Sequence, residues 1–136
     1  MKNNEHSSYG SAAIAEQIRL FNESEFAKLL GMNILEASEG YAKVVMDCTG
    51  KMNPGGVAHG GAIFALADQA FGIAANCCGI HRVAVSVSIQ YIAPAKGTLV
   101  AIARRVEDNG SCDTYRVMVH DGDRPVAEFT GTSFRV

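Results

Sequence analysis

The sequence lacks several features that would assign a protein to the membrane, the secretory route or nucleic acid. No uncharged run reaches the ~18 to 20 apolar residues that a membrane-spanning helix needs, so we expect no membrane partner. The first twenty residues contain no continuous apolar stretch and no cleavage-site pattern, which predicts no secretory signal and a cytoplasmic location. The formal net charge is only −2, so bulk electrostatics predict no nucleic-acid partner.

Residue spacings typical of metal and nucleotide sites are also absent. The four cysteines show no CxxC spacing, and the histidines show no HxxxH or HExxH spacing, so we expect reduced thiols and no bound metal. Gly55 and Gly60 have the separation of a phosphate-binding loop, but Gly61 and Ala62 stand where that loop needs Lys and Ser or Thr. This pattern excludes a nucleoside triphosphate as the ligand.

What is present is a chain of 136 residues that fits one domain, residues 1–136, with 48% hydrophobic residues for its core. Residues 1–10 are polar and expected to be disordered, and residues 11–30 carry a helical apolar pattern, interrupted before Ser24 and ended by Gly31. After residue 33 the apolar period changes to two, and the clearest predicted strands are 41–48, 83–91, 99–106, 114–120 and 125–134. We therefore predict an α+β fold in which a single antiparallel sheet wraps around one long central helix.

That central helix runs from Gly60 to Cys78 and contains one charged side chain, Asp68. A helix that is apolar on every side is expected in the core, where an unpaired carboxylate is costly or has a raised pKa. Two interpretations stay open: a structural carboxylate paired across a subunit contact, or a catalytic acid or base. Small residues at helical spacing from Asp68 predict a groove for a ligand or a second backbone; they are Gly61, Ala65, Gly72 and Ala75.

The start of the same helix favours the catalytic interpretation. His59-Gly60-Gly61 places two residues without side chains at the first turn, where backbone N–H groups have no partner within the helix. These donors and the positive end of the helix dipole suit an oxygen that gains negative charge, and glycine allows its close approach. An oxyanion site followed two turns later by a carboxylate predicts chemistry at a carbonyl group.

The segment that holds these residues, NPGGVAHGGAIFALADQAFGIAAN, resembles the signature of hotdog-fold acyl-CoA thioesterases of the phenylacetic acid degradation (PaaI) type, and the flanking segments extend the similarity over residues 25–136. The resemblance implies that Asp68 attacks the thioester or activates water and that the Gly60 N–H polarises its carbonyl, with Asn53 and His59 beside them. It also implies an acyl-CoA substrate and no separate cofactor, because coenzyme A is part of that substrate. The expected assembly is a homodimer or homotetramer whose active sites are shared between subunits.

The resemblance leaves the acyl group and the water site open. It favours an aromatic acyl group, such as phenylacetyl, or a short- to medium-chain one. Some relatives carry a hydroxyl residue where this chain has Gly72, so we expect Asn53 or Gln69 to hold the water. The polar face of strand 83–91 and three basic residues complete the candidates for substrate binding, which are Gly61, Gln69, Ser86, Ser88, Lys96, Arg104 and Arg105.

Two other functions fit the same fold. A hotdog dehydratase or hydratase needs a histidine and a carboxylate poised together on the acyl chain, and the motif here does not resemble those enzymes. A non-catalytic acyl-CoA-binding sensor would keep the fold without the chemistry, but no DNA-binding helix-turn-helix accompanies the domain. Cys77 and Cys78 have no base near them in sequence, so we do not expect a cysteine nucleophile.

Overall fold

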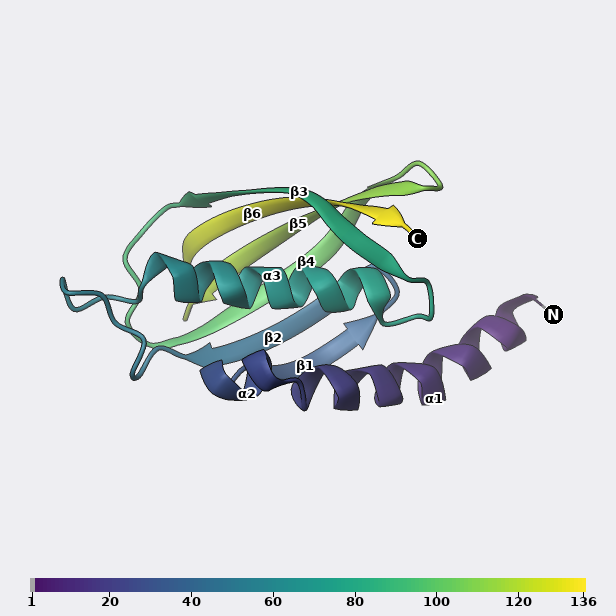
Figure 1. Cartoon of the computed structure of the whole chain (residues 1–136), viewed down its shortest axis with the longest axis horizontal. Helices are drawn as coiled ribbons and strands as arrows, with labels where there is room; N and C mark the ends of the chain where they lie inside the picture. Colours follow the sequence, from purple (N-terminus) through teal and green to yellow (C-terminus); the bar gives the residue numbers. More distant parts are fainter. Residues whose placement is uncertain (1) are drawn as a thin grey trace.

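A computed structural model describes the backbone of residues 2–136 and the side chains of residues 11–136. One long helix lies along the inside of a curved sheet, and a second long helix runs outside it (Figure 1). In chain order, the helices and strands are α1 (Lys2–Asn22), α2 (Glu25–Leu30), β1 (Asn33–Ser38), β2 (Tyr41–Asp47), α3 (Gly60–Asn76), β3 (Arg82–Tyr91), β4 (Thr98–Asp108), β5 (Cys112–Asp121) and β6 (Arg124–Arg135).

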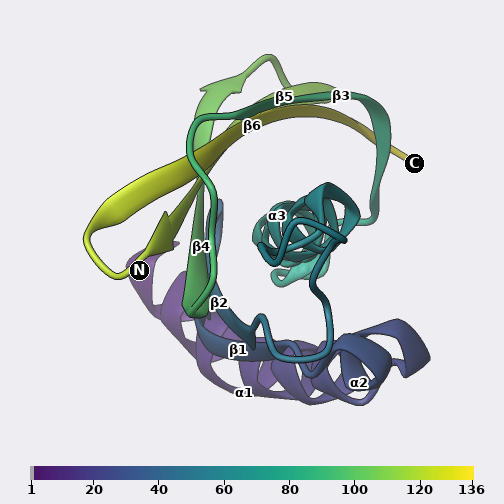
Figure 2. The same cartoon turned by 90° about the vertical axis from the view of Figure 1, so that its left-hand side faces the viewer.

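The six strands form one antiparallel sheet in the order β1-β2-β4-β5-β6-β3. The sheet curls around α3, as the view along that helix shows (Figure 2). Short turns join β4, β5 and β6 as hairpins, and their alternating residues place every second side chain toward α3. The predicted fold and the order of its elements are confirmed, and the strand limits differ from the predicted ones by a few residues.

α3 fills the concave side of the sheet because most of its surface is apolar. Ten of its 17 residues are buried. The ring of Phe71 packs against those of Tyr115 and Phe129 from the sheet, with centroids 5.4 and 5.7 Å apart. One stripe of the helix is open, however, and Gly61 and Asp68 on it are exposed. The prediction of a helix buried on every side is wrong along this stripe, because the sheet does not close around it.

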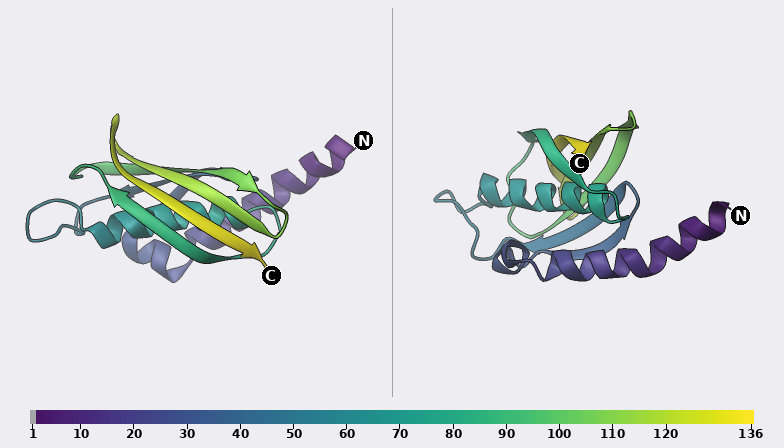
Figure 3. Two further views of the ribbon diagram at one scale, coloured as in Figure 1. Left: turned by 90° about the horizontal axis from the view of Figure 1, so that it is seen from above. Right: turned by 45° about the vertical axis from the view of Figure 1, so that its right-hand side comes forward.

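The two edges of the sheet are covered differently. α1 runs beside β1 (Figures 1 and 3), and the Asn22 side-chain oxygen accepts a hydrogen bond of 2.9 Å from the Ile34 N–H. At the other edge, no further element of residues 2–136 pairs with β3. Val87 and Tyr91 on that strand are 37% and 53% exposed. An open strand edge with apolar side chains is suited to pairing with a second chain.

A β-bulge in β3 corrects the predicted arrangement of that strand. The alternation predicted that all its apolar residues share one face. The pairing register with β6 shifts between Ala84 and Ser86, so Val83 lies opposite the exposed Phe134, whereas Val87 lies on the side of the sheet that faces α3. The extra residue at a bulge turns the following part of the strand over. The single apolar face predicted for β3 is therefore wrong at its first residues.

The N-terminal segment forms two helices, as its interrupted pattern predicted. Ser24 is the N-cap of α2, although its hydroxyl donates to the Phe21 carbonyl oxygen at 2.8 Å rather than capping the helix. Gly31 ends α2 with a left-handed backbone (φ 65°), which glycine adopts without strain. Disorder was predicted for residues 1–10. The side chains of these residues are not among those that the structure describes. In residues 2–136, no helix has the length and apolar character that a membrane span requires.

Candidate active site

α3 begins in a turn that leaves one backbone donor free. His59 is the N-cap, and its Nδ1 accepts a hydrogen bond of 2.8 Å from the Gly61 N–H. The N–H groups of Ala62 and Ile63 both donate to the His59 carbonyl oxygen. Within the described part of the chain, the Gly60 N–H has no hydrogen-bond partner. The predicted oxyanion donor is therefore available at the positive end of the α3 dipole.

Asn53 lies in the loop before α3, and its side-chain oxygen is hydrogen-bonded to the backbone of that loop. Its Oδ1 accepts hydrogen bonds from the Gly55 N–H at 2.9 Å and the Val57 N–H at 3.3 Å. Both lone pairs of the oxygen are then occupied, which leaves the Nδ2 group to donate to a ligand. Asn53 can donate to a substrate oxygen or to a water molecule, but its Oδ1 is not free to accept a hydrogen bond from that water.

An open pocket of about 360 Å³ brings Asn53 and Gly60 together with the end of β3. Tyr91, the last residue of β3, lines this pocket, and its hydroxyl donates a hydrogen bond of 2.9 Å to the Gly60 carbonyl oxygen. The sequence did not single out Tyr91, because it reads as one more apolar residue in an alternating strand. The only signal was an aromatic residue at the end of that strand, and its contact with Gly60 spans 31 residues.

Asp68 lies on the exposed stripe of α3 and has no ion-pair or hydrogen-bond partner among residues 11–136. Neighbouring protein atoms partly displace water from its carboxylate, and this desolvation raises the pKa of Asp68 above its ordinary value of 3.8. Asp68 follows Gly60 by eight positions, which corresponds to about 12 Å along the helix axis at 1.5 Å per residue. One chain therefore does not bring the carboxylate and the free amide to the same carbonyl group.

A second open pocket, of about 390 Å³, lies on the α2 side of the same helix start. Phe26 and Leu30 of α2 and Met52 of the preceding loop give it an apolar lining, and His59 and Gly61 form its border with α3. The first turn of α3 thus separates the pocket that holds the free amide from a second one with few polar groups.

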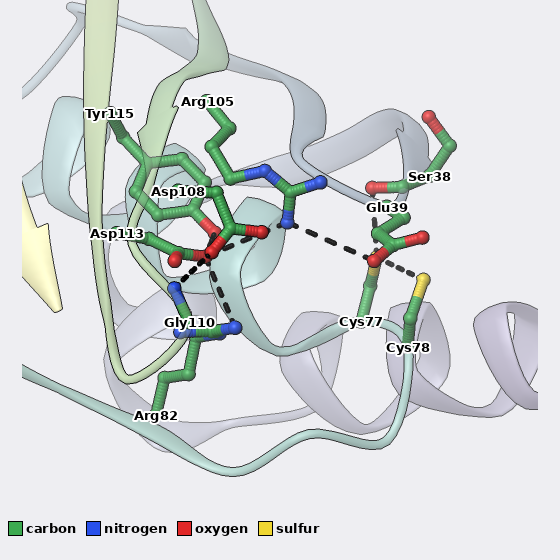
Figure 4. Close-up of polar contacts among 10 residues, drawn as sticks. All are labelled: Ser38, Glu39, Cys77, Cys78, Arg82, Arg105, Asp108, Gly110, Asp113 and Tyr115. Atoms are coloured by element: carbon green, nitrogen blue, oxygen red, sulfur yellow. Dashed lines mark hydrogen bonds and ion pairs between the residues drawn. The ribbon is translucent and has the colours of Figure 1, made fainter. Parts of the chain in front are cut away.

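The structure separates the predicted basic residues from one another. The Arg105 guanidinium lies between the carboxylates of Glu39 and Asp113, at 3.8 and 3.5 Å, in a cluster at the opposite end of α3 (Figure 4). The Arg104 guanidinium lies over the Tyr41 ring, 4.8 Å from its centroid. Neither residue lines the pocket beside the helix start. The prediction that places them with the substrate gains no support from this geometry.

Lys96 is the one predicted cation that lies near the pocket. It is exposed, it follows the lining residues Pro94 and Ala95, and its N–H donates to Asp121 Oδ2 at 3.0 Å. Arg124, which the sequence did not single out, donates a hydrogen bond to the Pro94 carbonyl oxygen. The Arg124 guanidinium therefore stands at the rim of the pocket, and the backbone of Lys96 directly follows the lining residues. The hairpin that brings Arg124 there was predicted, but nothing in the pattern indicated the contact.

The remaining predicted residues are divided between the outside of the sheet and the helix. Ser86 and Ser88 are exposed and pair with Thr132 and Thr130 of β6, on the outer face of the sheet, so the structure does not bring them to Gly60. Gln69 is half-buried, and its Nε2 group is buried without a hydrogen-bond partner. Because this donor is buried, the water-holding role predicted for Gln69 stays a prediction.

Comparison with known proteins assigns the chain to a family. The sequence model of the Thioesterase superfamily matches residues 55–128. A putative esterase from Archaeoglobus fulgidus is 39% identical over 121 residues, which cover 86% of this chain and 79% of the relative. The acyl-coenzyme A thioesterase PaaI from Escherichia coli is 35% identical over 121 residues, 86% of each protein.

Solved structures agree with these matches. The E. coli PaaI structure superimposes with a TM-score of 0.84, at 32% identity, covering 90% of this chain and 94% of that one. A Streptococcus mutans protein solved with bound acetyl CoA superimposes with a TM-score of 0.72, at 30% identity, covering 77% of this chain and 88% of that one. The chain therefore belongs to the thioesterase superfamily and is a hotdog-fold thioester hydrolase of the PaaI type.

Proposed function

We propose that this protein hydrolyses acyl-CoA thioesters to a free acid and coenzyme A. The observation that carries the proposal is the unpaired Gly60 N–H, which opens into a pocket on the helix whose single, unpaired carboxylate is Asp68. Catalysed hydrolysis of a thioester uses a donor for the carbonyl oxygen and a nucleophile or base near the carbonyl carbon, and a carboxylate can supply the second. The PaaI relative named an acyl-coenzyme A thioesterase and the relative with bound acetyl CoA support coenzyme A as the thiol part.

The groups fit two routes with the same products. In the first, the Asp68 carboxylate attacks the carbonyl carbon, the thiolate of CoA leaves, and water then cleaves the mixed anhydride to the acid and the free carboxylate. In the second, Asp68 removes a proton from a water molecule while the water oxygen attacks the carbonyl carbon. The proton then passes to the departing sulfur of CoA. The Gly60 N–H stabilises the negative oxygen in both routes, and Asn53 Nδ2 is a donor for substrate or water.

The site is completed by a second copy of the chain. About 12 Å of helix separates Gly60 from Asp68 of the same chain, which is more than a carboxylate side chain reaches. Both groups lie on surfaces that a single chain leaves open, and β3 offers an apolar edge for pairing. A two-fold axis through this open side would set Asp68 of each protomer against Gly60 of its partner and form two equivalent sites.

Subunit complementation tests the shared site. Inactive Asp68→Asn protomers are mixed with inactive Gly60→Pro protomers and allowed to exchange. A heterodimer then contains one site with both defects and one site with neither, so up to half of the wild-type activity per dimer returns. Proven exchange without any recovery would mean that each chain builds its site alone.

The substrate class follows from the two pockets beside the helix start. The pocket with the free amide has the Arg124 guanidinium at its rim and Lys96 directly after its lining residues, and cations here suit the phosphates of coenzyme A. The apolar pocket of about 390 Å³ has space for an aromatic or a short- to medium-chain acyl group. Substrates with acyl groups of graded length therefore test which pocket receives the acyl part.

The decisive experiment is a panel of acyl-CoA thioesters with release of free thiol as the readout and the Asp68→Asn variant as the control. We expect wild-type protein to release thiol from aromatic or short- to medium-chain substrates and the variant to release almost none. A sensor would bind the panel without releasing thiol. A hydratase would change the absorbance of enoyl-CoA without releasing thiol. Either result would replace the proposed activity.

A further inference from the structure

The side chain of Tyr91 lies directly on the residue that supplies the free amide. Its hydroxyl donates to the Gly60 carbonyl oxygen at 2.9 Å. A Cβ atom placed on Gly60 would lie 3.3 Å from both Cζ and Oη of Tyr91, which is tighter than an ordinary van der Waals contact. A side chain at position 60 would therefore crowd Tyr91 within the chain itself, in addition to hindering the approach of a ligand.

Tyr91 completes a set of contacts that fixes both peptide planes around the free amide. The Gly60–Gly61 peptide is held at its carbonyl by the Tyr91 hydroxyl and at its N–H by His59 Nδ1. The preceding peptide is held at its carbonyl by two N–H groups of the first helical turn. The Gly60 N–H belongs to that preceding peptide, so its direction is set before any ligand binds. Donors that are oriented in advance stabilise an oxyanion without reorganisation during the reaction.

Burial in the core does not explain why a tyrosine stands at position 91. The Tyr91 side chain is 53% exposed, and it lies at the end of an edge strand where removal of its hydroxyl opens no cavity in the core. Its polar end points at the helix start rather than into solvent, and its ring forms one wall of the pocket that holds Asn53 and Gly60. These features match a residue that serves the pocket.

We propose that Tyr91 is a positioning residue: its hydroxyl fixes the Gly60–Gly61 peptide, and through it the backbone of the residue that carries the free N–H, and its ring walls the pocket that receives the thioester. This inference rests on the proposed function, since the amide matters only if it binds the carbonyl oxygen. Tyr91 itself makes no bond to the reacting atoms. Its contribution is expected in the rate of the chemical step rather than in ground-state binding.

The test compares two variants that each remove one tyrosine hydroxyl. Tyr91→Phe removes the bond to Gly60, and Tyr41→Phe removes a bond of the same 2.9 Å length to Glu36, on β2 and outside the pocket. We expect Tyr91→Phe to lower kcat about 3- to 10-fold with KM within about two-fold, the size expected for one hydrogen bond. Tyr41→Phe is expected to keep wild-type kcat. The amide resonances of Gly60 and Gly61 should shift in Tyr91→Phe and not in Tyr41→Phe.

A second comparison tests the ring. Gly60→Ala crowds Tyr91, and Tyr91→Ala removes the crowding, so the double variant should lose less activity than the product of the two single losses. Active wild-type protein with an unchanged kcat in Tyr91→Phe, or with multiplicative losses in the double variant, overturns the inference and leaves the proposed function intact. Wild-type protein that hydrolyses no thioester contradicts the proposed function itself.

Discussion

Asp68 and Asp113 mark two regions of the molecule that treat a carboxylate in opposite ways. Asp68 is exposed on the open stripe of α3 and has no described partner. Asp113 is fully buried near the other end of α3, 3.1 Å from the Arg82 guanidinium and 3.5 Å from that of Arg105, and its Oδ2 accepts from the Tyr115 hydroxyl at 3.2 Å. Figure 4 shows this second carboxylate enclosed by its partners.

The difference separates the part of the structure that binds a ligand from the part that holds the fold together. A buried charge is tolerated only with partners, and Asp113 has three of them. A carboxylate that is partly desolvated and left without a partner costs stability, and groups of this kind cluster at functional sites. Changes near Asp68 should therefore lower activity and spare stability, and changes near Asp113 should do the reverse.

The largest expected effect comes from Asp68→Asn. Loss of the nucleophile or base should lower kcat by about two to four orders of magnitude, the usual range for a positioned acid–base group. Stability should not fall, because the change removes an unpaired, partly desolvated charge. Steady-state turnover and urea unfolding measure the two quantities, and Asp123→Asn in the exposed β5–β6 turn is the matched control. A variant within a few-fold of wild-type turnover removes Asp68 from the mechanism.

Gly60→Pro is expected to have the next largest effect. Proline deletes the N–H, and loss of an oxyanion donor should remove about 3 kcal/mol of transition-state stabilisation, roughly 150-fold in rate. The helix should survive, because Gly60 is its first residue and proline is well accepted there. His59, with φ −61° and ψ 135°, already has the extended backbone that a following proline favours.

Gly60→Ala is the matched control for this change. It adds the same Cβ against the Tyr91 ring and keeps the N–H, so its loss measures crowding alone. Equal activity of the folded Pro and Ala variants would show that the Gly60 amide does not act on the carbonyl oxygen. Circular dichroism and subunit assembly confirm that both variants keep the fold.

Asp113→Asn tests the other side of the comparison. The change leaves the buried Arg82 guanidinium without its ion-pair partner, and breaking such a pair should destabilise the fold by about 3 kcal/mol. Turnover per folded molecule should stay near that of the wild type, since the cluster lies far from the helix start. Urea unfolding at one fixed protein concentration is required, because assembly adds to the apparent stability. An unchanged midpoint would show that the cluster contributes nothing to the fold.

The fold was largely readable from the sequence, and the partners of individual side chains were not. Period-two alternation predicted β2 to β6, since each strand has one face on α3 and one in solvent. The bulge at Val85 was invisible, because valines at 83, 85 and 87 continue the alternation whether or not the strand turns over. Arg105 was predicted to bind substrate, since a charge alone does not reveal Glu39 and Asp113 as its partners.

The residues of the candidate site also fall into two groups, those that the sequence could predict and those that it could not. His59, Gly60 and Asp68 could be selected because their chemistry is local: a cap, a helix start and a lone charge on an apolar helix. Tyr91 and Arg124 reach the pocket through contacts between segments far apart in the chain, 31 and 30 residues from their acceptors. Residue type and spacing within one segment carry no information on such contacts, so these two could be found only from the structure.

The smallest effect expected is a shift in the pH dependence of activity. The reaction needs Asp68 as a carboxylate, and desolvation raises its pKa above 3.8, so activity should fall as the pH falls through that raised value. Between 3.8 and the raised pKa the folded chain binds the proton more tightly than the unfolded chain, so the contribution of Asp68 to stability decreases as the pH rises through this window. The acid limb of kcat/KM in the wild type should therefore lie above pH 3.8. The stability advantage of Asp68→Asn should be present at pH 7 and vanish toward pH 3.8. An acid limb at or below 3.8, or the same limb in the residual activity of Asp68→Asn, would assign the titration to another group and weaken the contrast with Asp113.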